Sequence, residues 1–194
     1  MLARDEFLAV YDLLDRGMSE GDCGVPCAAF CCTGAAVKYL LPGEEELFGA
    51  RHPEVPLIAK PWYVQVVQSE CCCARPHRMF ACRAFPFRPV IDGATGAVTD
   101  LVKVKNEAFE PCWIEEPLAD WKARAMQAWE IVLGDEENRA LYGRVQYLAD
   151  LLDEMGDAFF EIPPGELDDW FLGKVNEMTA HQRAHLYKKY FPSA

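Results

Sequence analysis

Nine cysteines stand out in this chain of 194 residues, because all but one of them fall into two clusters. The first cluster comprises Cys23, Cys27, Cys31 and Cys32, and the second comprises Cys71, Cys72, Cys73 and Cys82. Thiolates are soft ligands that suit both Zn²⁺ and iron–sulfur clusters. In a reducing compartment, such a dense group binds metal more often than it forms disulfides. Every cysteine of the two clusters is therefore a candidate metal ligand, with zinc as the first candidate and iron or an iron–sulfur cluster as the alternative.

The first cluster has the features of a helix N-terminus. Pro26 suits the first turn of a helix, which would place Cys27 and Cys31 one turn apart on the same face. The unsatisfied N–H groups and the positive end of the helix dipole lower the pKa of thiols at that position and favour metal binding. Cys23, in the loop just before, could fold back to the same metal.

Adjacent cysteines limit how many thiols one metal ion can take. Cys31 and Cys32 would diverge by about 100° on a helix and by about 180° on a strand, so one tetrahedral site rarely uses both. The thiols also outnumber the four ligands of a structural zinc. Either two metal sites share these cysteines, or one site takes four of them and the others are buried thiols. Cys112, outside the clusters, fits a small core residue as well as it fits a ligand.

The second cluster carries a family resemblance. It ends in the segment Arg78-Met79-Phe80-Ala81-Cys82-Arg83-Ala84-Phe85-Pro86-Phe87. Taken with the double cysteine of the first cluster, this segment resembles the signature of the CxxCxxCC cysteine-cluster family, a YkgJ-type group described as zinc- or iron-chelating domains. The stretch Leu41-Pro42-Gly43-Glu44-Glu45 is similar to the turn and acids that often follow the family's double cysteine.

The resemblance covers about residues 20–112 and departs from the family in two places. The first cluster has three-residue spacers where the family has two, and Met79 stands where the family has proline. The resemblance implies that the metal ligands are Cys23, Cys27, Cys31, Cys32, Cys72 and Cys82, with Cys71 and Cys73 as contenders for the place of Cys72.

Arginines surround the second cluster. Four thiolates on a divalent metal leave a net charge of about −2, which guanidinium groups can offset through hydrogen bonds to sulfur. Arg83 follows a candidate ligand directly, so we expect it to support the cofactor in this way. Arg75, Arg78 and Arg88 could act similarly, or could simply pair with acids at the surface.

The charge and hydropathy of the chain indicate which classes of partner it can have. The net charge is −12, and most of the excess acid lies after residue 105. Such a surface repels phosphate backbones, so no nucleic-acid partner is expected. Acids near residue 1 do not suit an export signal, and the apolar stretches are shorter than a membrane span of about 20 residues. We therefore expect a cytoplasmic protein without a membrane partner, whose acidic helices could meet another protein.

The expected fold class is α+β, with a small irregular sheet beside the cysteine-rich loops and a helical C-terminal half. Residues 1–112 would form the cysteine-cluster domain with an N-terminal helix, and residues 113–194 an acidic helical region packed on it. Apolar periodicity and turn residues predict the individual elements. These are helices at 2–14, 44–49, 118–134, 135–156, 166–178 and 180–190, strands at 34–41 and 62–68, and a hairpin of 87–91 with 98–104.

Two functions fit these patterns. The first is a metal-binding module whose cysteine-ligated site is structural and supports a surface for a partner protein. The second is an iron–sulfur enzyme or redox component, because the resembling family includes a protein-modifying enzyme. No phosphate-binding glycine loop, nucleophile elbow or S-adenosylmethionine-binding pattern accompanies the cysteines, so no catalytic residue is predicted.

Overall fold

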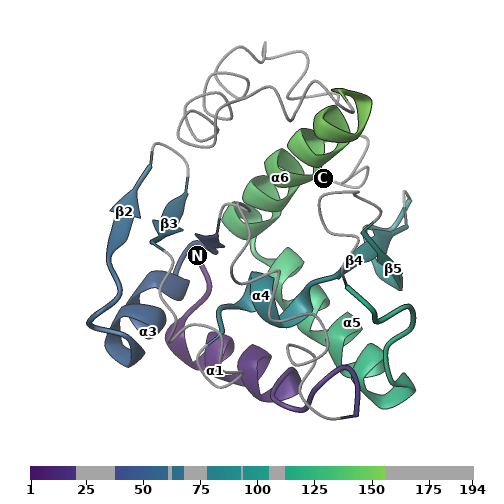
Figure 1. The fold of residues 1–194 in the computed structure, drawn as a ribbon, viewed down its shortest axis with the longest axis horizontal. Helices are drawn as coiled ribbons and strands as arrows, with labels where there is room; N and C mark the ends of the chain where they lie inside the picture. Colours follow the sequence, from purple (N-terminus) through teal and green to yellow (C-terminus); the bar gives the residue numbers. More distant parts are fainter. Residues whose placement is uncertain (21–37, 61–62, 68–77, 93, 105–111, 156–194) are drawn as a thin grey trace.

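The computed structural model describes residues 1–20, 38–60, 63–67, 78–92, 94–104 and 112–155, with residues 147–155 described for their backbone. These residues form an α+β fold, as the sequence predicts (Figure 1). Their helices are α1 (Arg4–Leu13), α3 (Glu44–Arg51), α4 (Phe80–Ala84), α5 (Ala119–Gly134) and α6 (Glu136–Met155). Their strands are β1 (Tyr39–Leu40), β2 (Leu57–Ala59), β3 (Val64–Val66), β4 (Phe87–Ile91) and β5 (Val98–Lys103).

The strands form two separate antiparallel sheets rather than one. In the first sheet β3 lies between β1 and β2, and in the second β4 pairs with β5. The hairpin of β4 and β5 confirms the prediction, with Phe87 opposite Lys103 and Pro89 opposite Leu101. Its turn is closed by Asp92, whose side chain accepts hydrogen bonds from the backbone and hydroxyl of Thr95.

The larger hydrophobic core joins α1 to α5, to the start of α6 and to the hairpin. The predicted apolar face of α1 is buried, because Phe7, Val10 and Leu14 point into this core. The ring of Trp129 on α5 packs edge-on against Phe80 at 4.7 Å between centroids. A smaller cluster lies beside the first sheet and comprises Leu40, Phe48, Val55, Val66 and Met79.

The predicted helices over 118–134 and 135–156 correspond to α5 and α6. Asp135 caps α6 as predicted, because its Oδ1 accepts a hydrogen bond from the backbone N–H of Asn138 at 3.0 Å. Helix α1 ends at Leu13, before the predicted end at residue 14, and α3 extends the predicted helix to Arg51. None of the helices in the described ranges is long and apolar enough to cross a membrane.

Two elements were not predicted. Strand β2 is largely exposed and, among the described strands, pairs with β3 alone, so it lacks the alternating apolar pattern that marks a half-buried strand. Helix α4 has five residues, too few to show a helical period. Residues 34–37 of one predicted strand, the ends of the strand predicted at 62–68, residue 156 and the two predicted C-terminal helices lie outside the described residues.

Candidate functional site

One residue of the two cysteine clusters, Cys82, lies in the described part of the chain. It is the third residue of α4, and its side chain is half-buried. Cys112 is also described and half-buried, and neither residue forms a disulfide. The other predicted ligands lie outside the described residues, namely Cys23, Cys27, Cys31, Cys32, Cys71, Cys72 and Cys73.

Helix α4 places Cys82 at the edge of the smaller core cluster. Phe80, Arg83 and Ala84 form its buried face, while Cys82 packs against the cluster and stays partly accessible. In Figure 1, α4 lies in the middle of the view, with α1 and α3 to one side and the hairpin to the other. The Cys82 side chain is thus supported by packing on one side and partly exposed on the other.

The start of α4 is held by a buried acid, Glu44, which begins α3. The side chain of Glu44 is fully buried, and its carboxyl group accepts three hydrogen bonds. The donors are the hydroxyl of Tyr11, the backbone N–H of Leu41 at 2.9 Å and the backbone N–H of Phe80 at 2.6 Å. One side chain therefore joins α1, the turn before α3 and the first residue of α4.

Burial governs the protonation of this group. It raises the pKa of Glu44, and the hydrogen bonds to the carboxyl group and the charge of Arg83 offset only part of the effect. Burial also raises the pKa of Tyr11, and the neighbouring Glu44 raises it further. Tyr11 therefore keeps its phenolic proton and donates it to Glu44.

The second half of α4 is held by Arg83, which is 2% exposed. Its Nε donates to the carbonyl oxygen of Arg78 at 2.7 Å, and its Nη1 donates to the carbonyl oxygen of Tyr11 at 3.4 Å. Its guanidinium lies 4.3 Å from the centroid of the Tyr11 ring, a cation–π contact. Asp15 lies 3.7 Å from the same Nη1, which provides a partial countercharge.

The surroundings of Arg83 bear on its predicted role beside a thiolate. Burial lowers the pKa of Arg83, while its neighbours Tyr11 and Asp15 act in the opposite direction. Its described contacts are to backbone oxygens, a carboxylate and an aromatic ring, so it anchors α4 to α1. Hydrogen bonding of Arg83 to a metal-bound sulfur stays a prediction.

The other arginines near the second cluster have different positions. The side chain of Arg78 is buried, and its carbonyl oxygen receives the hydrogen bond from Arg83. Arg88, on β4, donates to the side-chain oxygen of Gln146 on α6 at 2.9 Å and so joins the hairpin to that helix. Arg75 lies outside the described residues.

Tyr39 on β1 is a neighbour of Cys82 that the sequence did not indicate. Burial raises its pKa, and the negative charges of Glu44 and Cys82 raise it further. Strand β1, which carries Tyr39, contacts α4, which carries Cys82.

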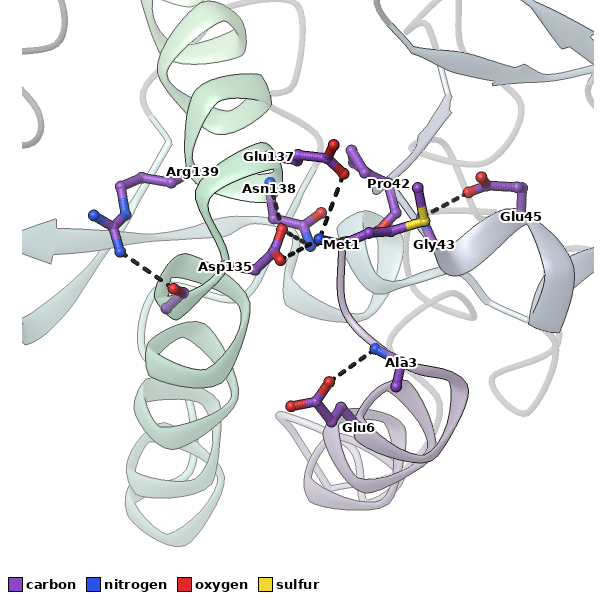
Figure 2. A network of polar contacts seen from close by, with 11 residues as sticks. Met1, Ala3, Glu6, Pro42, Gly43, Glu45, Asp135, Glu137, Asn138 and Arg139 are labelled. Carbon is purple, nitrogen blue, oxygen red and sulfur yellow. Dashed lines mark hydrogen bonds and ion pairs between the residues drawn. The ribbon is translucent and has the colours of Figure 1, made fainter.

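The turn before Glu44 is shaped by its contact with the start of the chain (Figure 2). Gly43 has φ +92°, and a Cβ built on it would lie 2.6 Å from the carbonyl oxygen of Leu2. The amino group of Met1 lies 2.6 Å from Oδ2 of Asp135, the N-cap of α6. The start of the chain thus contacts both this turn and the N-terminus of α6, and Asn138 of α6 also donates directly to the carbonyl oxygen of Pro42 at 3.4 Å.

No three His, Cys, Asp or Glu side chains gather as a metal site would require within the ranges that the structure describes. A metal held by Cys82 would therefore need ligands from the residues outside those ranges. The sequence does contain such ligands in quantity, since every other cysteine of both clusters lies there.

The buried polar contacts around Glu44 were missed by sequence reasoning. Glu44 follows Pro42 and Gly43 and stands with Glu45 and Glu46 in the first turn of a helix, where acids are common at an exposed surface. The only signal in the sequence was the family-like turn and acid. Nothing in the local pattern distinguishes Glu44 from its two neighbours, which are half-buried and exposed.

Comparisons with known proteins yield no match: no family model, no curated protein and no solved structure is similar to this chain. The residues of the chain itself must therefore indicate its function.

Proposed function

We propose that this protein binds a metal through cysteine thiolates and that Cys82 is one of the ligands. The observation that carries the proposal is the support given to α4, a single helical turn held by Glu44 at its start and by Arg83 near its end. A buried polar network costs desolvation energy, and here its effect is to hold one half-buried cysteine in place. Such support is typical of residues that orient a metal ligand.

The remaining ligands would come from the two clusters. A structural zinc takes four ligands in a closed tetrahedron, so three further thiolates would complete a site with Cys82. The candidates are Cys23, Cys27, Cys31, Cys32, Cys71, Cys72 and Cys73. Adjacent cysteines point in different directions, so some of these thiols would serve a second metal or none.

The proposed role of the metal is structural, in support of a surface that meets a partner protein. Helix α5 and the start of α6 carry exposed acids, among them Asp120, Glu130, Glu136 and Glu137. Trp129 of α5 packs against Phe80 of α4, so the helix that carries Cys82 belongs to the same core as the acidic helices. A metal that stabilises α4 would stabilise this surface too, and a partner with a basic face would suit it.

An iron–sulfur enzyme or redox component is the second candidate, because the chain has more thiols than one zinc uses. A cluster accepts ligands from several directions around a larger core, which adjacent cysteines can satisfy. Both candidates fit a cytoplasmic location, where thiols are kept reduced.

The test is metal and sulfide analysis of protein purified without oxygen, together with a visible absorption spectrum. The wild type is compared with Cys82→Ser and with Cys112→Ser, a matched control that removes the half-buried cysteine outside the clusters. Zinc with a featureless spectrum supports the structural module, and iron with acid-labile sulfide and a broad visible band supports the second candidate. Wild-type metal content in Cys82→Ser would exclude Cys82 as a required ligand.

A further inference from the structure

We propose that Glu44 is a positioning residue that holds Cys82 in the geometry needed to bind metal, without contacting the metal itself. The inference rests on the proposed function, because it assumes that Cys82 is a ligand. It adds a residue that lies outside both cysteine clusters and that belongs to another helix than Cys82. Its basis is the position of one carboxyl group among three segments of the chain.

The contacts of Glu44 are divided between its two oxygens. Oε1 accepts from the backbone N–H of Phe80 at 2.6 Å and from the hydroxyl of Tyr11, while Oε2 accepts from the backbone N–H of Leu41 at 2.9 Å. Phe80 is the first residue of α4, and Cys82 follows two residues later. Movement of the Glu44 carboxyl group would therefore be transmitted to Cys82 through less than one helical turn.

Helix α4 cannot hold this position by itself. A helix of five residues is far shorter than the length of about 12–15 residues that isolated helices need for even marginal stability. Its N-cap, Met79, provides no side-chain hydrogen bond to the first turn. The backbone N–H of Phe80 has no acceptor within the helix and donates to Glu44 instead. The start of α4 therefore depends on a residue from outside the helix.

Glutamate suits this position better than glutamine does. Glutamine keeps the length of the side chain but offers one oxygen, and its NH₂ group would face the N–H of Leu41, donor against donor. Tyr11→Phe is a milder change, because it removes one donor to Oε1 and leaves the bond to Phe80 in place. We therefore expect Glu44→Gln to weaken the support of α4 more than Tyr11→Phe does.

The experiment measures metal binding rather than stability. Zinc affinity is obtained by competition with a chelator, and the cobalt-substituted protein reports ligand geometry through its absorption bands. The proteins are wild type, Glu44→Gln, Tyr11→Phe and Val132→Ala. Val132 is fully buried in the larger core on α5, so Val132→Ala is a control that destabilises the fold away from Glu44.

We expect Glu44→Gln to bind zinc about 10- to 100-fold more weakly, the range found when residues that orient metal ligands are replaced. Its cobalt spectrum should differ from that of the wild type, and Tyr11→Phe should change both readouts in the same direction but less. Val132→Ala should keep the affinity and the spectrum of the wild type, since a purely structural loss does not alter the ligand geometry of the folded protein.

The outcomes separate this inference from the proposed function. If Cys82→Ser weakens zinc binding but Glu44→Gln matches Val132→Ala in affinity and spectrum, the positioning role is refuted and the metal site stands. If Cys82→Ser binds zinc as the wild type does, both proposals fail. If Glu44→Gln does not fold, Tyr11→Phe decides: an unchanged affinity and spectrum would overturn the positioning role.

Discussion

The backbone N–H of Phe80 donates a hydrogen bond to Oε1 of Glu44, with the two atoms 2.6 Å apart and the residues 36 positions apart in the sequence. This contact connects the first residue of α4 with the first residue of α3. Because the same carboxyl group also binds Tyr11 on α1, three helices meet at one buried polar group. The conformation of the segment that carries Cys82 is thus set by residues outside it.

The protonation of Glu44 should make the stability of the protein depend on pH in a definite direction. Burial raises the pKa of Glu44 above its ordinary value of 4.5, so the folded state retains a proton that the unfolded state releases. The contribution of Glu44 to stability is then complete below pH 4.5 and declines as the pH rises toward the raised value. The slope is at most about 1.4 kcal/mol per pH unit.

Glu44→Gln removes this titration and provides the comparison. The variant should be less stable at pH 5, by about 1–3 kcal/mol, because a buried N–H loses its acceptor. The difference from the wild type should become smaller as the pH rises from 5 to 8, which urea unfolding at each pH would measure. A difference that stays constant from pH 5 to pH 8 would mean that Glu44 is already ionised in the folded protein.

Replacement of Arg83 should destabilise the protein more than replacement of Arg88. Arg83→Met removes two buried hydrogen bonds, to the carbonyl oxygens of Arg78 and Tyr11, and the cation–π contact with the Tyr11 ring, with an expected loss of about 1–3 kcal/mol. Arg88→Met removes one half-buried hydrogen bond to Gln146 and should cost about 0.5–1.5 kcal/mol. Equal losses in chemical denaturation would contradict the anchoring role of Arg83.

Gly43→Ala and Gly134→Ala should act in opposite directions. At Gly43 the new Cβ would lie 2.6 Å from a carbonyl oxygen and the backbone has φ +92°, so the variant should lose about 1–3 kcal/mol. At Gly134, the last residue of α5, nothing lies within 4 Å of the new Cβ, and alanine should stabilise by about 0.5–1 kcal/mol. Thermal unfolding of the two variants tests the turn that presents Glu44.

The capping of α6 by Asp135 can be tested by replacing that residue. Asp135→Ala removes the acceptor for the N–H of Asn138 and should cost about 0.5–2 kcal/mol. Asp135→Asn keeps an acceptor at the cap and should cost less, although it weakens the ion pair with the amino group of Met1. Urea unfolding followed by circular dichroism measures the free energy of unfolding of both variants. An Asp135→Ala variant as stable as the wild type would contradict the capping role.

The proposed function predicts that a chelator destabilises the wild type. A ligand that binds only the folded state adds stability that grows with its concentration over its Kd. A strong chelator should therefore lower the Tm of the wild type and of Cys112→Ser, and have less effect on Cys82→Ser. A Tm that does not respond to the chelator in any of the three proteins would argue against a metal that supports the fold.

Local patterns were sufficient to predict most of the regular structure. The apolar spacing in α1 and α5, the Asp135 cap of α6 and the turn between β4 and β5 each depend on residues within a few positions of one another. Helix α4 escaped prediction because it is too short to show a period, and β2 because most of its side chains are exposed. All of the metal ligands remain predictions, including Cys82, the one cluster cysteine that lies in the described part of the chain.

The sequence by itself determined the α+β class, most of the helices and the chemistry available, since residue types and local spacing carry that information. Only the tertiary structure decided that Glu44, among three consecutive acids, is the one that is buried and that it meets Tyr11 and Phe80. The physical reason is that burial and hydrogen bonding between distant segments depend on how the helices pack, which no local pattern encodes. The same packing places Cys82 at the edge of a core, half-buried and held from both ends of its helix.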